Sequence, residues 1–71
     1  MTPRAERALN AIRAWVESAG RGPTSRELQS YVGRDVAKHG LAWLKTHRLV
    51  TWASEGSGTR YVERTKKSEA A

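Results

Sequence analysis

Four basic residues, a carboxylate and an alanine between positions 34 and 45 recur at spacings that bring them to one side of an α-helix. Guanidinium, ammonium and imidazole groups donate hydrogen bonds to phosphate oxygens and guanine edges. A carboxylate accepts from cytosine, and a small apolar residue permits close approach or contacts a thymine methyl group. The six residues are Arg34, Asp35, Lys38, His39, Ala42 and Lys45. This pattern predicts a helix face suited to nucleic acid.

Some residues of this segment have a simpler interpretation beside the functional one. Asp35 stands at the start of the expected helix, where a carboxylate can cap free backbone N–H groups, and we favour this role over base reading. Lys45 stands near the helix end, so we expect it to contact a phosphate. His39 and His47 are interpreted as surface residues, because no set of metal ligands accompanies them.

The net charge favours a polyanionic partner. The chain of 71 residues carries 13 Lys plus Arg against 7 Asp plus Glu, which gives a formal net charge of +6. A strongly basic small domain is typical of nucleic-acid binders, although many small basic proteins only have a solvated surface.

Composition also excludes several classes of site. The chain has no cysteine, so neither a disulfide nor a thiolate zinc site is expected, which fits a reducing compartment. No apolar run reaches the length of a membrane span, and no signal peptide is evident, so we expect a cytoplasmic, nucleoid-associated protein. We find no catalytic residues, cofactor motif or metal cluster, and we expect no enzymatic activity.

Three helices are expected in the first two thirds of the chain. Apolar residues at three- and four-residue spacing predict the first helix over residues 2–19. A capping box from Thr24 to Glu27 begins a second helix, which ends at Gly33. The third helix is expected over about 35–47, with apolar residues on the side opposite the polar face.

The pattern then changes from helical to extended. The segments LVTWAS (49–54) and TRYVER (59–64) are rich in β-branched and aromatic residues and are separated by EGSG, which predicts a β-hairpin. Three helices, a link of about two residues before the third, and a C-terminal hairpin together predict an α+β winged helix-turn-helix. We expect this domain over 1–63 and a basic tail over 64–71.

Side-chain packing is predicted from the same periodicity. Trp15 and Trp52 are expected in the core. Trp43 flanks the core stripe, where it either packs on neighbouring elements or contacts a partner. Arg13 and Glu17 lie one helical turn apart on the solvent side of the first helix and are expected to pair.

Beyond these patterns, the sequence resembles the DNA-binding domain of the LexA repressor family. The matching features are Thr-Pro-Arg at 2–4, Ile-Arg at 12–13, and Gly-x-x-Pro-Thr-x-x-Glu-Leu at 20–28. The stretch LAWLKTHRLV at 41–50, followed by a glycine-containing hairpin, also suits the broader winged-helix pattern. The resemblance covers residues 2–62 and implies a third helix in the major groove with a wing on the DNA backbone.

Three departures from the LexA pattern limit what is carried over. The stretch from Gly33 to Ala37 looks about two residues shorter than the usual turn. The surface of the third helix does not match that of LexA, so its operator sequence is not inferred. The self-cleaving and dimerising domain is also missing, and a switch by autoproteolysis is not expected.

Two further segments are expected to contact the DNA backbone. The start of the second helix offers free N–H groups, hydroxyls and a guanidinium, which together suit a phosphate. The hairpin tip is expected to lie along the backbone, and cations of the tail add non-specific attraction. The residues concerned are Thr24, Ser25 and Arg26 at the helix and Ser57, Gly58 and Arg60 at the wing.

The favoured function is a bacterial or phage transcriptional regulator that binds double-stranded DNA, with a homodimer or a protein partner left open. One alternative is a winged-helix module for protein interaction, for example a phage protein that binds a host enzyme or polymerase, through Trp43, Gly40 and Val36. Another is an accessory protein that bends DNA or assists recombination.

Overall fold

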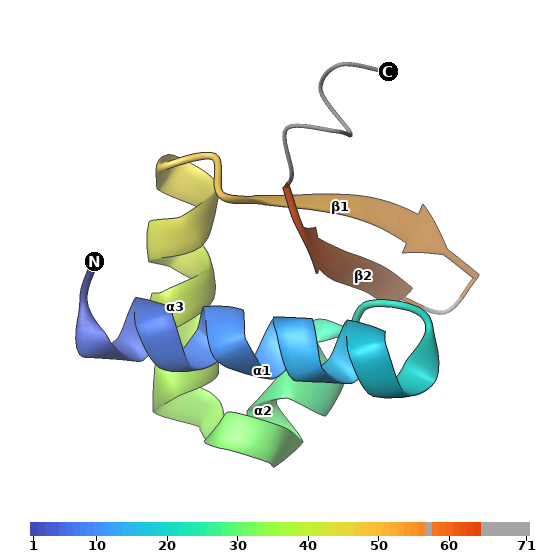
Figure 1. Cartoon of the computed structure of the whole chain (residues 1–71), viewed down its shortest axis with the longest axis horizontal. Helices are drawn as coiled ribbons and strands as arrows, with labels where there is room; N and C mark the ends of the chain where they lie inside the picture. The colour runs from blue at the N-terminus through green and yellow to red at the C-terminus, as the bar shows by residue number, and fades with distance from the viewer. Residues whose placement is uncertain (57, 65–71) are drawn as a thin grey trace.

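Three helices precede a two-stranded hairpin in the computed structural model, which describes residues 1–56 and 58–64 (Figure 1). The elements are α1 (Pro3–Ala19), α2 (Ser25–Val32), α3 (Arg34–Thr46), β1 (Val50–Glu55) and β2 (Gly58–Glu63). α1 runs across α3, and the hairpin extends from the end of α3 over one side of the helices. The predicted α+β, three-helix winged-helix arrangement is therefore confirmed.

The ends of α1 and α2 follow from local side chains. The Thr2 hydroxyl accepts a hydrogen bond from the N–H of Ala5 at 3.1 Å, and Gly20 ends α1 with a left-handed backbone at φ 76°. At α2 the predicted capping box is present in both directions. The N–H of Glu27 donates to the Thr24 hydroxyl at 3.1 Å, and the Glu27 carboxylate accepts from the N–H of Thr24 at 2.9 Å.

α3 ends in a turn that normally contains glycine. The N–H of Leu49 donates to the carbonyl of Leu44 at 2.9 Å, and the N–H of Arg48 donates to that of Lys45 at 3.1 Å. This pair of hydrogen bonds defines a Schellman motif, whose reversing residue adopts a left-handed backbone. That residue is Arg48, with φ 57°. A side chain at this position incurs a steric penalty that glycine avoids.

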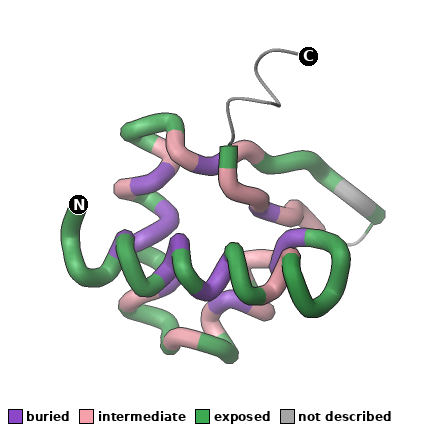
Figure 2. The backbone as a smooth tube through the Cα atoms, viewed as in Figure 1, coloured by how far each residue is buried: buried purple, intermediate pink, exposed green. Residues whose placement is uncertain are grey.

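The core lies where α1 crosses α3, and it extends to the hairpin (Figure 2). It consists of Ala5, Ala8, Leu9, Ala11, Ile12, Leu28, Ala37, Leu41, Leu44, Val50 and Tyr61. A Cβ atom at Gly40 would lie 2.6 Å from the Cβ of Ala8 and 2.7 Å from the carbonyl oxygen of Arg4. A side chain at position 40 would therefore collide with α1, which packs closely against α3 at this point.

The two strands are antiparallel, with Trp52 opposite Tyr61. β2 also pairs with the segment just before α2, because the N–H of Tyr61 donates to the carbonyl of Pro23 at 2.9 Å. A Cβ at Gly22 would collide with the Tyr61 carbonyl. The wing is thus fastened by backbone pairing to the turn between α1 and α2.

Two tryptophans predicted for the core lie elsewhere. Trp52 is 53% exposed on the hairpin, where it lies opposite Tyr61. Trp15 is half-buried outside the core cluster, where its ring meets that of Tyr31 edge to face at 6.1 Å. The prediction was wrong because both side chains lie away from the α1–α3 crossing: Trp15 packs against α2, and Trp52 lies on the hairpin.

Candidate nucleic-acid interface

One side of α3 is left uncovered by the other elements. Its opposite side carries buried Ala37, Gly40, Leu41 and Leu44. Of the six residues that the sequence assigned to a binding face, five are exposed and Lys45 is half-buried. The exposed residues are Arg34, Asp35, Lys38, His39 and Ala42. The helix therefore presents polar groups along a surface that a ligand can reach.

Asp35 connects α3 to α1. Its carboxylate accepts a hydrogen bond from the Nε of Arg4 at 2.7 Å, and the Nε2 of His39 lies 3.2 Å from its other oxygen. The hydrogen bond from Arg4 holds the pKa of Asp35 below its ordinary value. α3 has no side-chain cap hydrogen bond, so the predicted capping role of Asp35 was wrong. The carboxylate forms an ion pair with Arg4 instead.

A groove of about 590 Å³ separates the start of α2 from β2. It brings together five residues that the sequence assigned to the DNA backbone, from segments more than thirty positions apart. These residues are Thr24, Ser25, Arg26, Gly58 and Arg60. The sixth assigned residue, Ser57, lies outside the described part of the chain, as do residues 65–71 of the expected basic tail.

Within this groove the Arg60 side chain connects β2 to the turn before α2 and to α2 itself. Its Nη1 donates to the carbonyl of Gly22 at 2.9 Å and to the Glu27 carboxylate at 3.1 Å, and its side chain is only 17% exposed. The pKa of Glu27 is lowered, mainly by its hydrogen bond from the backbone of Thr24 and further by Arg60. Arg60 thus positions the groove wall and presents little of its guanidinium to a phosphate.

A second ion pair joins the wing to α1. The Nε and Nη2 atoms of Arg13 donate to the two carboxylate oxygens of Glu63 at 2.9 and 2.6 Å. This bidentate contact lowers the pKa of Glu63 and raises that of Arg13. The predicted pairing of Arg13 with Glu17 was wrong, because the end of β2 offers Arg13 a carboxylate in bidentate geometry.

The ammonium group of Lys45 lies over two aromatic rings of the wing. Its Nζ is 5.3 Å from the ring centre of Trp52 and 5.0 Å from that of Tyr61. These are cation–π distances, and they connect the end of α3 to the face of the hairpin. The exposed ring of Trp52 and the neighbouring Arg48 are candidate binding groups that sequence reasoning missed. An arginine at the position where glycine usually ends a helix was the available signal for Arg48.

Trp43, the predicted partner contact, is half-buried against the core. Its ring stacks on that of His47, with centres 3.9 Å apart and planes inclined by 28°. Gly40, assigned to the same hypothetical contact, is buried under α1. Of the three residues assigned to this contact, Val36 and Trp43 therefore remain partly exposed.

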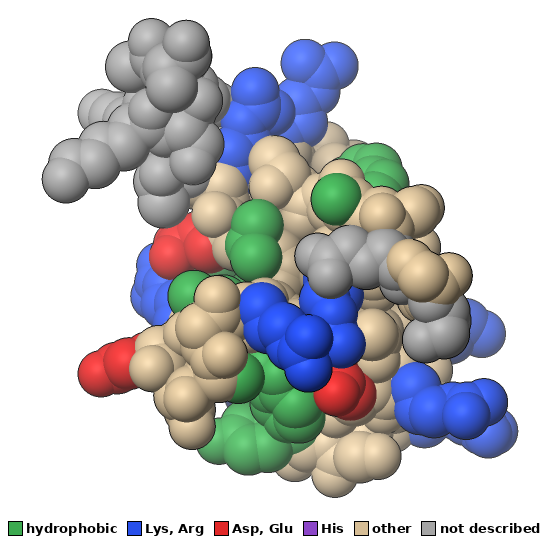
Figure 3. Space-filling model, turned by 90° about the vertical axis from the view of Figure 1, so that its right-hand side faces the viewer, with side chains coloured by type: hydrophobic (Ala, Val, Ile, Leu, Met, Phe, Trp, Pro, Cys, Tyr) green, Lys and Arg blue, Asp and Glu red, His purple; other side chains and the backbone are tan. Residues whose placement is uncertain are grey.

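Positive charge is spread over the side of the molecule that includes the wing tip and the turn between α1 and α2. Figure 3 shows Lys and Arg side chains at several places on this face and Asp and Glu side chains at fewer. Glu27, Asp35 and Glu63 each accept a hydrogen bond from an arginine of another element. Their negative charges are therefore largely compensated within the fold.

No protein-family model matches this sequence, and a search of curated proteins found no relative. In the described residues, no group of three His, Cys, Asp or Glu side chains is placed to hold a metal ion. No helix in the same part of the chain is both long and apolar enough to cross a membrane.

Proposed function

We propose that this protein binds double-stranded DNA and acts as a small bacterial or phage transcriptional regulator. One observation carries the proposal: the side of α3 that the other elements leave uncovered presents the cations Arg34 and Lys38 to solvent. The winged-helix order of elements suits this use, since an exposed α-helix fits the width of the major groove.

Each part of the interface has a distinct role in the proposed complex. Arg34 and Lys38 donate to guanine edges or to phosphates, and Ala42 permits close approach of α3 to the bases. The start of α2 offers backbone N–H groups and the guanidinium of Arg26 to a phosphate. Asp35 pairs with Arg4 through Oδ2, and this ion pair connects the start of α3 to α1.

The similarity of residues 2–62 to LexA-type domains supports the same docking of α3. Because a domain of this size contacts a short site, high affinity would come from two copies on adjacent half-sites. Control would then depend on the protein concentration or on dimerisation.

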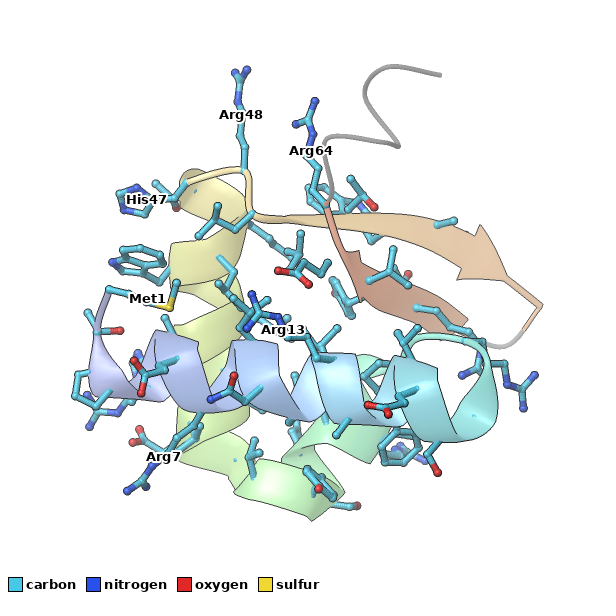
Figure 4. The ribbon with its side chains drawn as sticks, in the orientation of Figure 1. Met1, Arg7, Arg13, His47, Arg48 and Arg64 are labelled. Atoms are coloured by element: carbon cyan, nitrogen blue, oxygen red, sulfur yellow. The ribbon has the colours of Figure 1, made fainter. Side chains whose placement is uncertain are left out.

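Alanine substitutions in α3 test the proposal. Arg34→Ala and Lys38→Ala should each weaken binding to a preferred duplex by more than about 1 kcal/mol where the contact is bidentate. Arg7→Ala removes the same charge from α1 on the side away from the wing (Figure 4), and it should have little effect. Fluorescence anisotropy measures the affinities. Equal binding by all three variants and the parent would rule out this side of α3 as the reader.

The salt dependence of binding supplies a second readout. Arg60 makes hydrogen bonds within the fold and Lys45 contacts two aromatic rings, so neither is counted as a phosphate contact. We therefore expect about three to four phosphate contacts and a slope of log K against log salt near −3 to −4. Lys38→Ala should reduce the magnitude of the slope by about one if Lys38 contacts a phosphate.

A further inference from the structure

A shallow pocket of about 370 Å³ lies where the end of α3 meets β1. Its lining residues are Lys45, Arg48, Val50, Thr51, Trp52 and Arg64. Three of these six side chains are cationic, and no described Asp or Glu side chain lines the pocket. The site therefore combines a positive field with an aromatic wall, away from the groove at the start of α2.

The aromatic wall is accessible. Trp52 is 53% exposed, whereas its cross-strand partner Tyr61 is 7% exposed. The rings are tilted by 46° with centres 6.4 Å apart, and the Nζ of Lys45 lies over both. Val50 is buried in the core and holds β1 against the helices. The indole is thus supported from inside by a lysine and a tyrosine while much of its surface faces solvent.

One of the arginines at the rim of the pocket has an unfavourable backbone conformation. Arg48 adopts φ 57° at the end of α3, where glycine would fit without strain. The N–H of Arg64 donates to the carbonyl of Leu49 at 2.9 Å, which fixes the two arginines on neighbouring segments. Figure 4 shows both side chains projecting from the same side of the molecule. Strain retained at a pocket rim points to a role for the side chain.

We propose that this pocket binds an unpaired nucleotide next to a duplex, with the base stacked on Trp52 and the phosphate held by Arg48 and Arg64. Proteins bind single strands by this combination of an aromatic platform and cations, because every base has a π-face. Bases inside an intact duplex already stack on one another, so the exposed indole favours an unpaired one. The inference rests on the proposed function, since Lys45 joins the pocket to the binding side of α3.

Paired probes separate this inference from the proposed function. One is a short blunt duplex, and the other is the same duplex with a short thymine overhang at either end. The parent protein should bind the overhang duplex roughly 5- to 100-fold more tightly, as expected for a stacked base. Trp52→Ala should abolish this preference, and Trp52→Phe should retain most of it because a ring remains.

A third variant excludes misfolding as an explanation. Arg48→Gly removes the guanidinium and also relieves the left-handed strain, so it should melt no lower than the parent while losing several-fold of the overhang preference. Arg7→Ala, with the same change in charge on the far side of the molecule, should keep the preference.

The binding of the two duplexes decides between the two proposals. If the parent binds both duplexes equally well, the pocket proposal is overturned and the proposed function stands. If the preference persists in Trp52→Ala, the overhang binds elsewhere and the pocket proposal is likewise overturned. If neither duplex binds, both proposals fail.

Discussion

Two junctions in this molecule use different contacts. Where α1 crosses α3, backbones and small side chains meet, with Gly40 against Ala8 and Arg4. Where the wing meets the helices, it adds buried apolar side chains to the core, and Arg60 and Arg13 bridge elements through carbonyl and carboxylate oxygens. The first junction depends mainly on shape, and the second, the polar junction, also depends on charge.

The two parts of the proposed binding surface, α3 and the wing, are therefore held by different kinds of contact. Close packing leaves almost no room for a larger side chain, since a single added carbon atom would overlap with a neighbour. Exposed ion pairs are weaker and respond to salt and pH. The helix crossing therefore sets the orientation of α3, whereas the polar junction sets the position of the wing beside it.

The largest effect is expected at the helix crossing. Gly40→Ala places a Cβ 2.6 Å from that of Ala8 and 2.7 Å from the Arg4 carbonyl oxygen. Overpacking of this kind should destabilise the fold by about 2–3 kcal/mol, even though alanine favours a helix by roughly 1 kcal/mol. Urea unfolding followed by circular dichroism measures the change.

Ala42 provides a matched control on the same helix. It is exposed, so Ala42→Leu should change stability by no more than about 0.5 kcal/mol. Equal stability of Gly40→Ala and the parent would show that the two helices separate at little cost, and the contrast between the junctions would be lost.

A smaller effect is expected in the polar junction. Arg60→Met keeps the length of the side chain but leaves the Gly22 carbonyl and the Glu27 carboxylate without the guanidinium. A lost hydrogen bond to a charged group at a partly buried site should cost about 1–2 kcal/mol. Thermal unfolding measures the change.

A double-mutant cycle with Glu27→Gln isolates the contact between the two side chains. Their coupling should be positive and should decrease in high salt, as expected for an ion pair at the surface. No coupling would mean that Arg60 stabilises the wing through the Gly22 carbonyl alone.

The smallest effect is expected at the second ion pair and depends on pH. Glu63→Gln removes the bidentate contact with Arg13 and should cost about 0.5–1 kcal/mol at neutral pH, because the pair is partly exposed. The pKa of Glu63 is lowered in the folded protein, chiefly by its hydrogen bond from Arg13. Its contribution is therefore present above the ordinary glutamate pKa and lost as pH falls through the folded value.

Melting temperatures between neutral pH and about pH 3 test this sign. The parent should lose its advantage over Glu63→Gln as the solution becomes acidic, since the protonated carboxyl no longer attracts Arg13. An advantage that persists unchanged at acidic pH would show that the ion pair contributes nothing to it.

The sequence was sufficient to predict the elements because their signals are local. The capping box at Thr24 and Glu27, the glycine at position 33 and the change to β-branched residues after 49 each act within a few positions. Predicted boundaries differ from the observed ones by about one residue. Even the crossing at Gly40 had a local signal, because a glycine inside a helix usually has a packing reason.

Contacts between distant segments were not predictable in the same way. Arg13 had a carboxylate one turn away in Glu17, yet it pairs with Glu63, fifty residues later. Arg60 was assigned to the DNA backbone because it lies near a hairpin tip, whereas the turn before α2 and α2 itself each supply it with one acceptor. Only the assembled fold shows which of several oxygens lies within reach.

The central claim, that α3 and the groove between α2 and β2 bind duplex DNA, is tested most directly by an NMR titration of ¹⁵N-labelled protein with a blunt duplex at low and moderate salt. We expect shifts centred on residues 34–45 and 24–26 and on the described part of the wing, and these should decrease as salt rises. Shifts confined to α1 around Arg7, or none at low salt, would contradict the claim.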